Sequence, residues 1–185
     1  MKRLLLPFLL LSMSLFIAAC SSDDNSSTDT EQETTAEEPK ETSDSDGMEM
    51  KSALLDYQME IIDTVNANDS AIYAFESAKA KEEDKPSDEE IAKLKADAEA
   101  AAKTVAEDVR ALEVPAALDA NKEEIQGALE DLASSYETRA ANLSDEANAE
   151  YAESDEKFAS FEEKMAALYE EAGLTKPSFS ADIVD

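Results

Sequence analysis

Apolar residues recur at steps of three and four along most of the chain from residue 48 onward, which is the spacing that places them on one face of an α-helix. Four such segments can be followed, over about residues 48–81, 87–112, 116–143 and 144–172. Pro86, Pro115 and Pro177 lie between or after these segments rather than inside them. The pattern therefore predicts four amphipathic helices.

Several residues at the ends of the segments predict where helices begin and stop. Ser87 precedes Glu90 by three residues, which is the spacing of a capping box at the start of a helix. Gly173 followed by Leu174 is typical of a Schellman stop at the end of the fourth segment. Asn68 interrupts the apolar face of the first segment, where we expect it to set the register or to contact a partner.

The boundary between the third and fourth segments is marked by neither glycine nor proline. Asn142 and Ser144 favour a turn there, with Ser144 as the residue that caps the fourth helix. An unbroken helix over residues 115–172 would be about 87 Å long, against about 50 Å for the first segment. Four segments match one another better in length, so we predict an all-α, antiparallel up-down-up-down four-helix bundle over residues 47–174. A three-helix bundle with one long helix is the alternative.

The first nineteen residues have a different pattern. Lys2 and Arg3 precede an apolar stretch that reaches Ala19, and this stretch is too short for a membrane-spanning helix. This arrangement predicts a secretory signal peptide over residues 1–19. Residues 20–46 then contain many acidic, serine and threonine side chains and no aliphatic one larger than alanine, so we expect a disordered acidic linker.

Composition narrows the chemistry that this chain can perform. The formal net charge is −29, and the 185 residues include 45 Asp or Glu and no histidine. Without histidine, Ser-His and Cys-His nucleophile pairs and histidine-based metal or haem sites are excluded. The chain also lacks a glycine-rich phosphate loop and a basic cluster, so nucleic acid is a poor partner. We therefore expect a protein that is not an enzyme and that has no cofactor and no dedicated metal site.

The sequence Ile17-Ala18-Ala19-Cys20 resembles the lipobox of bacterial lipoproteins. The resemblance implies cleavage between Ala19 and Cys20, an S-diacylglyceryl group on the Cys20 thiol and, in some such proteins, N-acylation of the new amino terminus. The protein would then be attached through lipid to the extracytoplasmic face of the cell membrane.

The stretches at residues 157–174 and 112–143 are similar to parts of small all-helical lipoproteins of Bacillus-type Gram-positive bacteria, including those described as cell-wall-binding. Membership would imply a helical bundle outside the cytoplasmic membrane, and it supplies no catalytic residues. The acidic charge of this chain opposes direct contact with polyanionic teichoic acids unless divalent cations bridge the two.

Two functions are consistent with these features. The first is a non-enzymatic interaction module whose partner is an envelope protein or a cell-wall component. The tail, residues 175–185, offers Phe179, Ile183 and Val184 as contact residues, unless it folds back on the bundle. The second is a ligand-binding or sensing module for a small molecule, a divalent cation or a wall fragment, with a cavity between helices near the aromatic residues.

Overall fold

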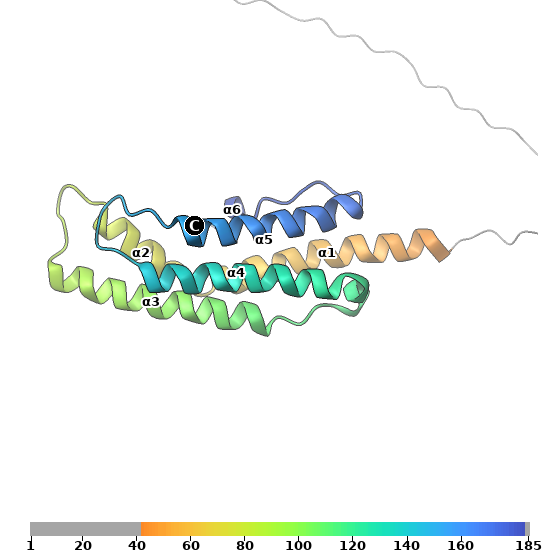
Figure 1. Cartoon of the computed structure of the whole chain (residues 1–185), viewed down its shortest axis with the longest axis horizontal. Coiled ribbons are helices and arrows are strands. Elements are labelled where there is room, and N and C mark those ends of the chain that lie inside the picture. The colour runs from red at the N-terminus through yellow and green to blue at the C-terminus, as the bar shows by residue number, and fades with distance from the viewer. Residues whose placement is uncertain (1–41, 184–185) are drawn as a thin grey trace, which may run out of the picture. The chain divides into compact units, whose positions relative to one another are not determined.

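The computed structural model describes residues 42–183, all of which lie in one compact unit of the chain (Figure 1). This part is all-α, as predicted, and no strand occurs within it. Its elements in chain order are α1 (Thr42–Asn66), α2 (Ser70–Lys79), α3 (Asp88–Ala111), the 3₁₀-helix η1 (Ala116–Asn121), α4 (Lys122–Asn142), α5 (Ala152–Glu171) and α6 (Phe179–Asp182).

Helices that follow one another along the chain pack against one another. α2 contacts α3, α3 contacts α4, α4 contacts α5, and α1 contacts α3 and η1. Figure 1 shows α3, α4 and α5 lying side by side along the long direction of the view. The fully buried core takes apolar side chains from every long helix, among them Leu54, Ile61, Val105, Leu132 and Phe161.

The first predicted helix is wrong in two respects. It is two helices, because residues 67–69 form a turn between α1 and α2. Asn66, Asn68 and Asp69 are crowded at this point, and such side chains compete with the helical backbone for hydrogen bonds. Asn68 lies in this turn and donates to Asp108 Oδ2 of α3 at 3.0 Å, so it ties the turn to the neighbouring helix. α1 also begins at Thr42, five residues inside the predicted linker.

Both predicted end signals are confirmed. The backbone amide of Glu90 donates to Ser87 Oγ at 3.3 Å, and the amide of Ser87 donates to Glu90 Oε2 at 2.9 Å, which completes the capping box of α3. Gly173 has φ +68°, and the amide of Leu174 donates to the carbonyl of Tyr169 at 2.8 Å. These are the features of a Schellman stop after α5.

The third and fourth segments are separate helices, so the alternative with one long helix is wrong. α4 ends at Asn142 and α5 begins at Ala152, and residues 143–151 form the connecting loop. The start of α5 differs from the prediction, because the N-cap residue is Tyr151 and not Ser144. Ser144 lies in the loop, where its backbone carbonyl accepts a hydrogen bond from Lys79 Nζ at 3.2 Å.

An ion pair on the surface joins α3 to α4. Arg110 Nε and Nη2 each lie 2.8 Å from a carboxylate oxygen of Glu130, and Arg110 Nη1 lies 2.5 Å from Glu137 Oε1. Hydrogen bonds from this guanidinium hold the pKa of both carboxyl groups below their ordinary value. The arrangement fixes two helices in register by means of charged side chains that remain partly in water.

The tail folds back onto the helices, so Phe179 and Ile183 are not exposed contact residues. Phe179 is fully buried, with its ring centroid 4.7 Å from that of Phe161 in α5. Ile183 is also buried, and its backbone carbonyl accepts a hydrogen bond from the Tyr73 hydroxyl at 2.5 Å. Val184 lies outside the described residues. The tail therefore belongs to the folded part, and the predicted boundary at residue 174 is too early.

Candidate functional site

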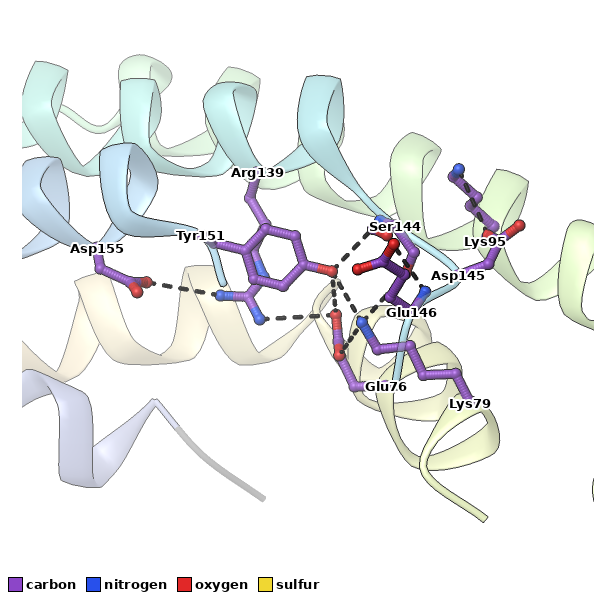
Figure 2. A network of polar contacts seen from close by, with 9 residues as sticks. All are labelled: Glu76, Lys79, Lys95, Arg139, Ser144, Asp145, Glu146, Tyr151 and Asp155. Carbon is purple, nitrogen blue, oxygen red and sulfur yellow. Dashed lines mark hydrogen bonds and ion pairs between the residues drawn. The ribbon is translucent and has the colours of Figure 1, made fainter. Parts of the chain in front are cut away.

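A lysine is buried where α2 meets the loop between α4 and α5. Lys79, the last residue of α2, is 3% exposed. Its ammonium donates to Tyr151 Oη at 2.9 Å and pairs with Glu76 Oε2 at 2.8 Å (Figure 2). Burial lowers the pKa of Lys79, but the hydrogen bonds to Glu76 and Tyr151 outweigh that effect, so the pKa is raised overall. Lys79 is therefore a charged group that holds the loop against α2.

Tyr151 links this lysine to an arginine of α4. Its hydroxyl donates to Glu76 Oε1 at 3.0 Å, and the guanidinium carbon of Arg139 lies 4.4 Å from its ring centroid. Figure 2 shows the Tyr151 ring alongside Arg139, with Asp155 on the far side. Arg139 Nη2 is 3.8 Å from Glu76 Oε1 and Arg139 Nη1 is 4.0 Å from Asp155 Oδ1, while Arg139 Nε is buried without a hydrogen-bond partner.

Next to Arg139 lies a cavity of about 180 Å³, which we name the Arg139 cavity. It is partly open to solvent and is lined by α4 and α5, by the start of α2, and by the tail that folds back over them. Its lining residues are Asp69, Ile72, Tyr73, Ser135, Tyr136, Arg139, Ser154, Asp155, Phe158, Ser180 and Ile183. Arg139 is the only basic residue among them, whereas two carboxylates take part.

The phenol of Tyr136 is held neutral in this cavity. Burial raises its pKa well above the ordinary value, and the proximity of Tyr73 and Asp69 raises it further. Two serines complete the polar wall: Ser154 Oγ donates to the Ser135 carbonyl at 2.9 Å and Ser135 Oγ donates to the Leu132 carbonyl at 2.9 Å. The cavity therefore presents ordered dipoles and charges of both signs beside an apolar wall.

A second feature lies on α1, away from the cavity. Met48, Leu55 and Met59 are 70%, 49% and 55% exposed and are spaced by seven and four residues, so they follow one line along the helix. We call this line the α1 apolar face. In Figure 1 the first turns of α1 extend beyond the adjacent ends of α4 and α5. Large apolar side chains are usually buried, so three of them in line form an unusual surface.

One side of the α1 apolar face is acidic. Glu49, Asp56, Glu60 and Asp63 are all exposed and succeed one another at steps of seven, four and three residues, so they form a parallel row on the helix. We call this row the acidic flank. The surface of α1 thus combines an apolar line with a negative row beside it.

The predicted lipidation residue Cys20 and the cleavage position after Ala19 lie outside the described residues. Phe179 and Ile183, which were predicted as exposed contact residues, are buried, and Ile183 lines the Arg139 cavity. Val184, the third of these residues, is not described by the structure. Sequence reasoning missed Lys79, although Ile72, Phe75 and Lys79 follow one another at steps of three and four, which places the lysine on the buried face. For Arg139 no local signal exists, because its surroundings come from three other segments.

No helix within residues 42–183 is both long and apolar enough to span a bilayer. In the same range, no group of three or more Asp, Glu, Cys or His side chains is arranged to hold a metal ion.

Comparison of the chain with protein-family models, with curated proteins and with solved structures finds no match.

Proposed function

We propose that this protein is a lipid-anchored, extracytoplasmic interaction module without enzymatic activity. The observation that carries the proposal is the α1 apolar face, where Met48, Leu55 and Met59 remain exposed in one line. Methionine-rich surfaces of this kind adapt to the side chains of a partner because the thioether chain is unbranched and flexible.

We propose a partner whose charge is complementary to that of α1. An envelope protein that presents a helix with an apolar stripe, and with Lys or Arg along one side of it, complements both the α1 apolar face and the acidic flank. A second copy of this chain would bring two acidic flanks together at a net charge of −29 each, so self-association is disfavoured. Polyanionic wall polymers are disfavoured by the same repulsion.

We also propose a lipid anchor at Cys20 and an up-down-up-down arrangement of the helices. Cys20 carries the diacylglyceryl group after cleavage behind Ala19, and it stands 22 residues before Thr42, the first residue of α1. The apolar face is therefore on the helix that follows the attachment residue most closely in the sequence. The proposal treats α1 with α2, α3, α4 and α5 as an up-down-up-down four-helix bundle, which the contacts between successive helices support.

The anchor is tested with Cys20→Ala in the organism that makes the protein. The variant is expected to keep the mobility of the uncleaved precursor and to lose incorporation of labelled fatty acid. Normal processing and labelling of Cys20→Ala would contradict the anchor without bearing on the α1 apolar face.

The partner is tested with a photo-crosslinking residue at position 52. Ser52 is exposed and lies between Met48 and Leu55 on the helix, so a bound partner is within reach. The control places the same residue at the exposed Glu107 of α3. Crosslinking is carried out with the full chain in intact cells, and the joined segment of the partner is mapped by mass spectrometry.

The proposal expects a discrete adduct from position 52 and not from position 107, with the joined segment forming an apolar helix face bordered by Lys or Arg. The same adducts from both positions, or a joined segment that is acidic, would contradict it.

The second candidate function is that of a ligand-binding or sensing module. The Arg139 cavity is the observation that favours it.

A further inference from the structure

We propose that the Arg139 cavity binds a small amino acid as a zwitterion, with the ligand carboxylate on Arg139 and the ligand ammonium toward Asp69. The binding site goes beyond the interaction proposed for α1, because it is formed by different elements and needs no partner protein.

Arg139 is short of hydrogen-bond acceptors. Its Nε is buried without a partner, and its two terminal nitrogens are 3.8 and 4.0 Å from the oxygens of Glu76 and Asp155, beyond hydrogen-bond distance. A carboxylate matches the planar fork of a guanidinium, and it would accept hydrogen bonds from the terminal nitrogens Nη1 and Nη2.

A simple anion does not fit the remaining charges. Asp69 is 5% exposed and lines the same cavity, while Asp155 and Glu76 each pair with a terminal nitrogen of Arg139 and offset part of its charge. The Asp69 carboxylate repels a second anion and attracts a cation. A ligand that carries an ammonium close to its carboxylate interacts favourably with both sides, and an α-amino acid has that arrangement.

The size and the apolar wall limit the ligand side chain. A protein cavity of about 150 Å³ accepts benzene, so the 180 Å³ here suits a ligand of about six to ten non-hydrogen atoms. Ile72, Phe158 and Ile183 supply apolar contacts. Alanine, valine and leucine fit this range, whereas a wall fragment of several sugars or a long peptide does not.

The experiment is a thermal melt of the full chain in detergent micelles, with and without ligand. The probes are L-valine, D-alanine and L-alanine, together with isovalerate, which lacks the ammonium of valine, and isobutylamine, which lacks its carboxylate. The proposal expects at least one amino acid to raise the melting temperature in a concentration-dependent way. Each valine analogue is expected to bind about tenfold more weakly than valine, or weaker still, because one charged contact is lost.

Two variants test whether Arg139 binds the ligand carboxylate and whether Asp69 attracts the ligand ammonium. Arg139→Gln is expected to weaken amino-acid binding about tenfold or more, and Arg110→Gln, the matched change on the surface pair with Glu130, is expected to leave it unchanged. Asp69→Asn keeps the shape of the side chain but is expected to abolish the preference for valine over isovalerate. If Arg139→Gln melts too early to measure, Arg139→Lys retains the charge without the fork and is expected to bind more weakly than the parent.

Several results would overturn the proposal. One is that no amino acid raises the melting temperature at millimolar concentration, which would leave the cavity as a site for water alone. Another is that isovalerate or isobutylamine acts as strongly as valine. The adduct expected from position 52 is independent of these measurements, so the two proposals can fail separately.

Discussion

The hydroxyl of Tyr169 in α5 donates a hydrogen bond of 2.7 Å to the backbone carbonyl of Leu54 in α1. This contact fastens the first helix to the last long one across 115 residues of chain. Tyr57, one turn beyond Leu54, is equally buried, but its hydroxyl has no hydrogen-bond partner. Two tyrosines in one core therefore differ in whether the hydroxyl stabilises the fold.

The two tyrosines make a matched pair of substitutions. Tyr169→Phe is expected to lower the free energy of unfolding by about 1 kcal/mol, because it removes the hydrogen bond between the two helices. Tyr57→Phe is expected to raise it by up to about 1 kcal/mol, because it removes a buried hydroxyl that has no acceptor. Urea unfolding followed by circular dichroism measures both. Equal destabilisation by the two changes would show that the two hydroxyls are in equivalent surroundings.

The same tyrosines make the fold sensitive to alkaline pH. Burial raises the pKa of Tyr57 and of Tyr169 to about 12, while tyrosine in an unfolded chain titrates near 10. Ionisation of these tyrosines therefore leaves the stability of the fold unchanged below about pH 10 and lowers it as the pH rises from about 10 to 12, because the unfolded chain releases these protons first. The urea midpoint is expected to fall over this range, and less steeply in a Tyr57→Phe, Tyr169→Phe double variant. Identical slopes would contradict the assignment.

Lys79 is expected to be the lysine whose removal destabilises the fold most clearly. Lys79→Met removes the ammonium that lies nearest to Glu76 and that donates to the Tyr151 hydroxyl, and it should lower the free energy of unfolding by about 2 kcal/mol. The exposed Lys103→Met is the control, with an expected change below about 0.5 kcal/mol. Hydrogen exchange in the 143–151 loop should also increase in Lys79→Met, because Lys79 bonds to the Ser144 carbonyl. Similar changes in both variants would exclude a special role for Lys79.

Substitution by alanine is expected to have opposite effects on stability at two glycines. Gly173 has φ +68°, so Gly173→Ala is expected to lower the free energy of unfolding by about 1 kcal/mol. Gly127 lies within α4, and an added methyl group there approaches nothing closer than Lys164 Nζ at 3.9 Å. Gly127→Ala is therefore expected to raise the free energy of unfolding by about 0.5 to 1 kcal/mol. Thermal or urea melts decide the sign, and destabilisation by Gly127→Ala would mean that the helix is crowded at this position.

The helices could be predicted from sequence because periodicity reports directly which face is buried. Leu54, Tyr57, Ile61 and Val65 follow the predicted face of α1 and are all buried. The comparison of lengths also identified the separation of α4 from α5, which no glycine or proline marks. The turn at residues 67–69 was missed because Ile72 and Phe75 continue the apolar spacing beyond it, so periodicity does not register the change of direction.

The candidate cavity could not be predicted in the same way. Asp69, Arg139 and Ile183 come from three distant parts of the chain, and only the packing of the tail brings them to one cavity. The α1 apolar face could not be predicted from sequence for another reason. Met48, Leu55 and Met59 have the spacing of a core face, and only the observed burial of Leu54, Tyr57 and Ile61 identifies which of two apolar faces the protein leaves in water.

The most direct test of the central claim measures the adduct from position 52 in a chain whose α1 apolar face has been removed. Met48→Gln, Leu55→Gln and Met59→Gln are combined and compared with a control that combines Lys93→Gln, Lys103→Gln and Glu107→Gln, all exposed on α3. The account predicts that the adduct is lost in the α1 variant and retained in the control, at equal amounts of folded protein. Retention of the adduct in the α1 variant would contradict the claim that this face binds the partner.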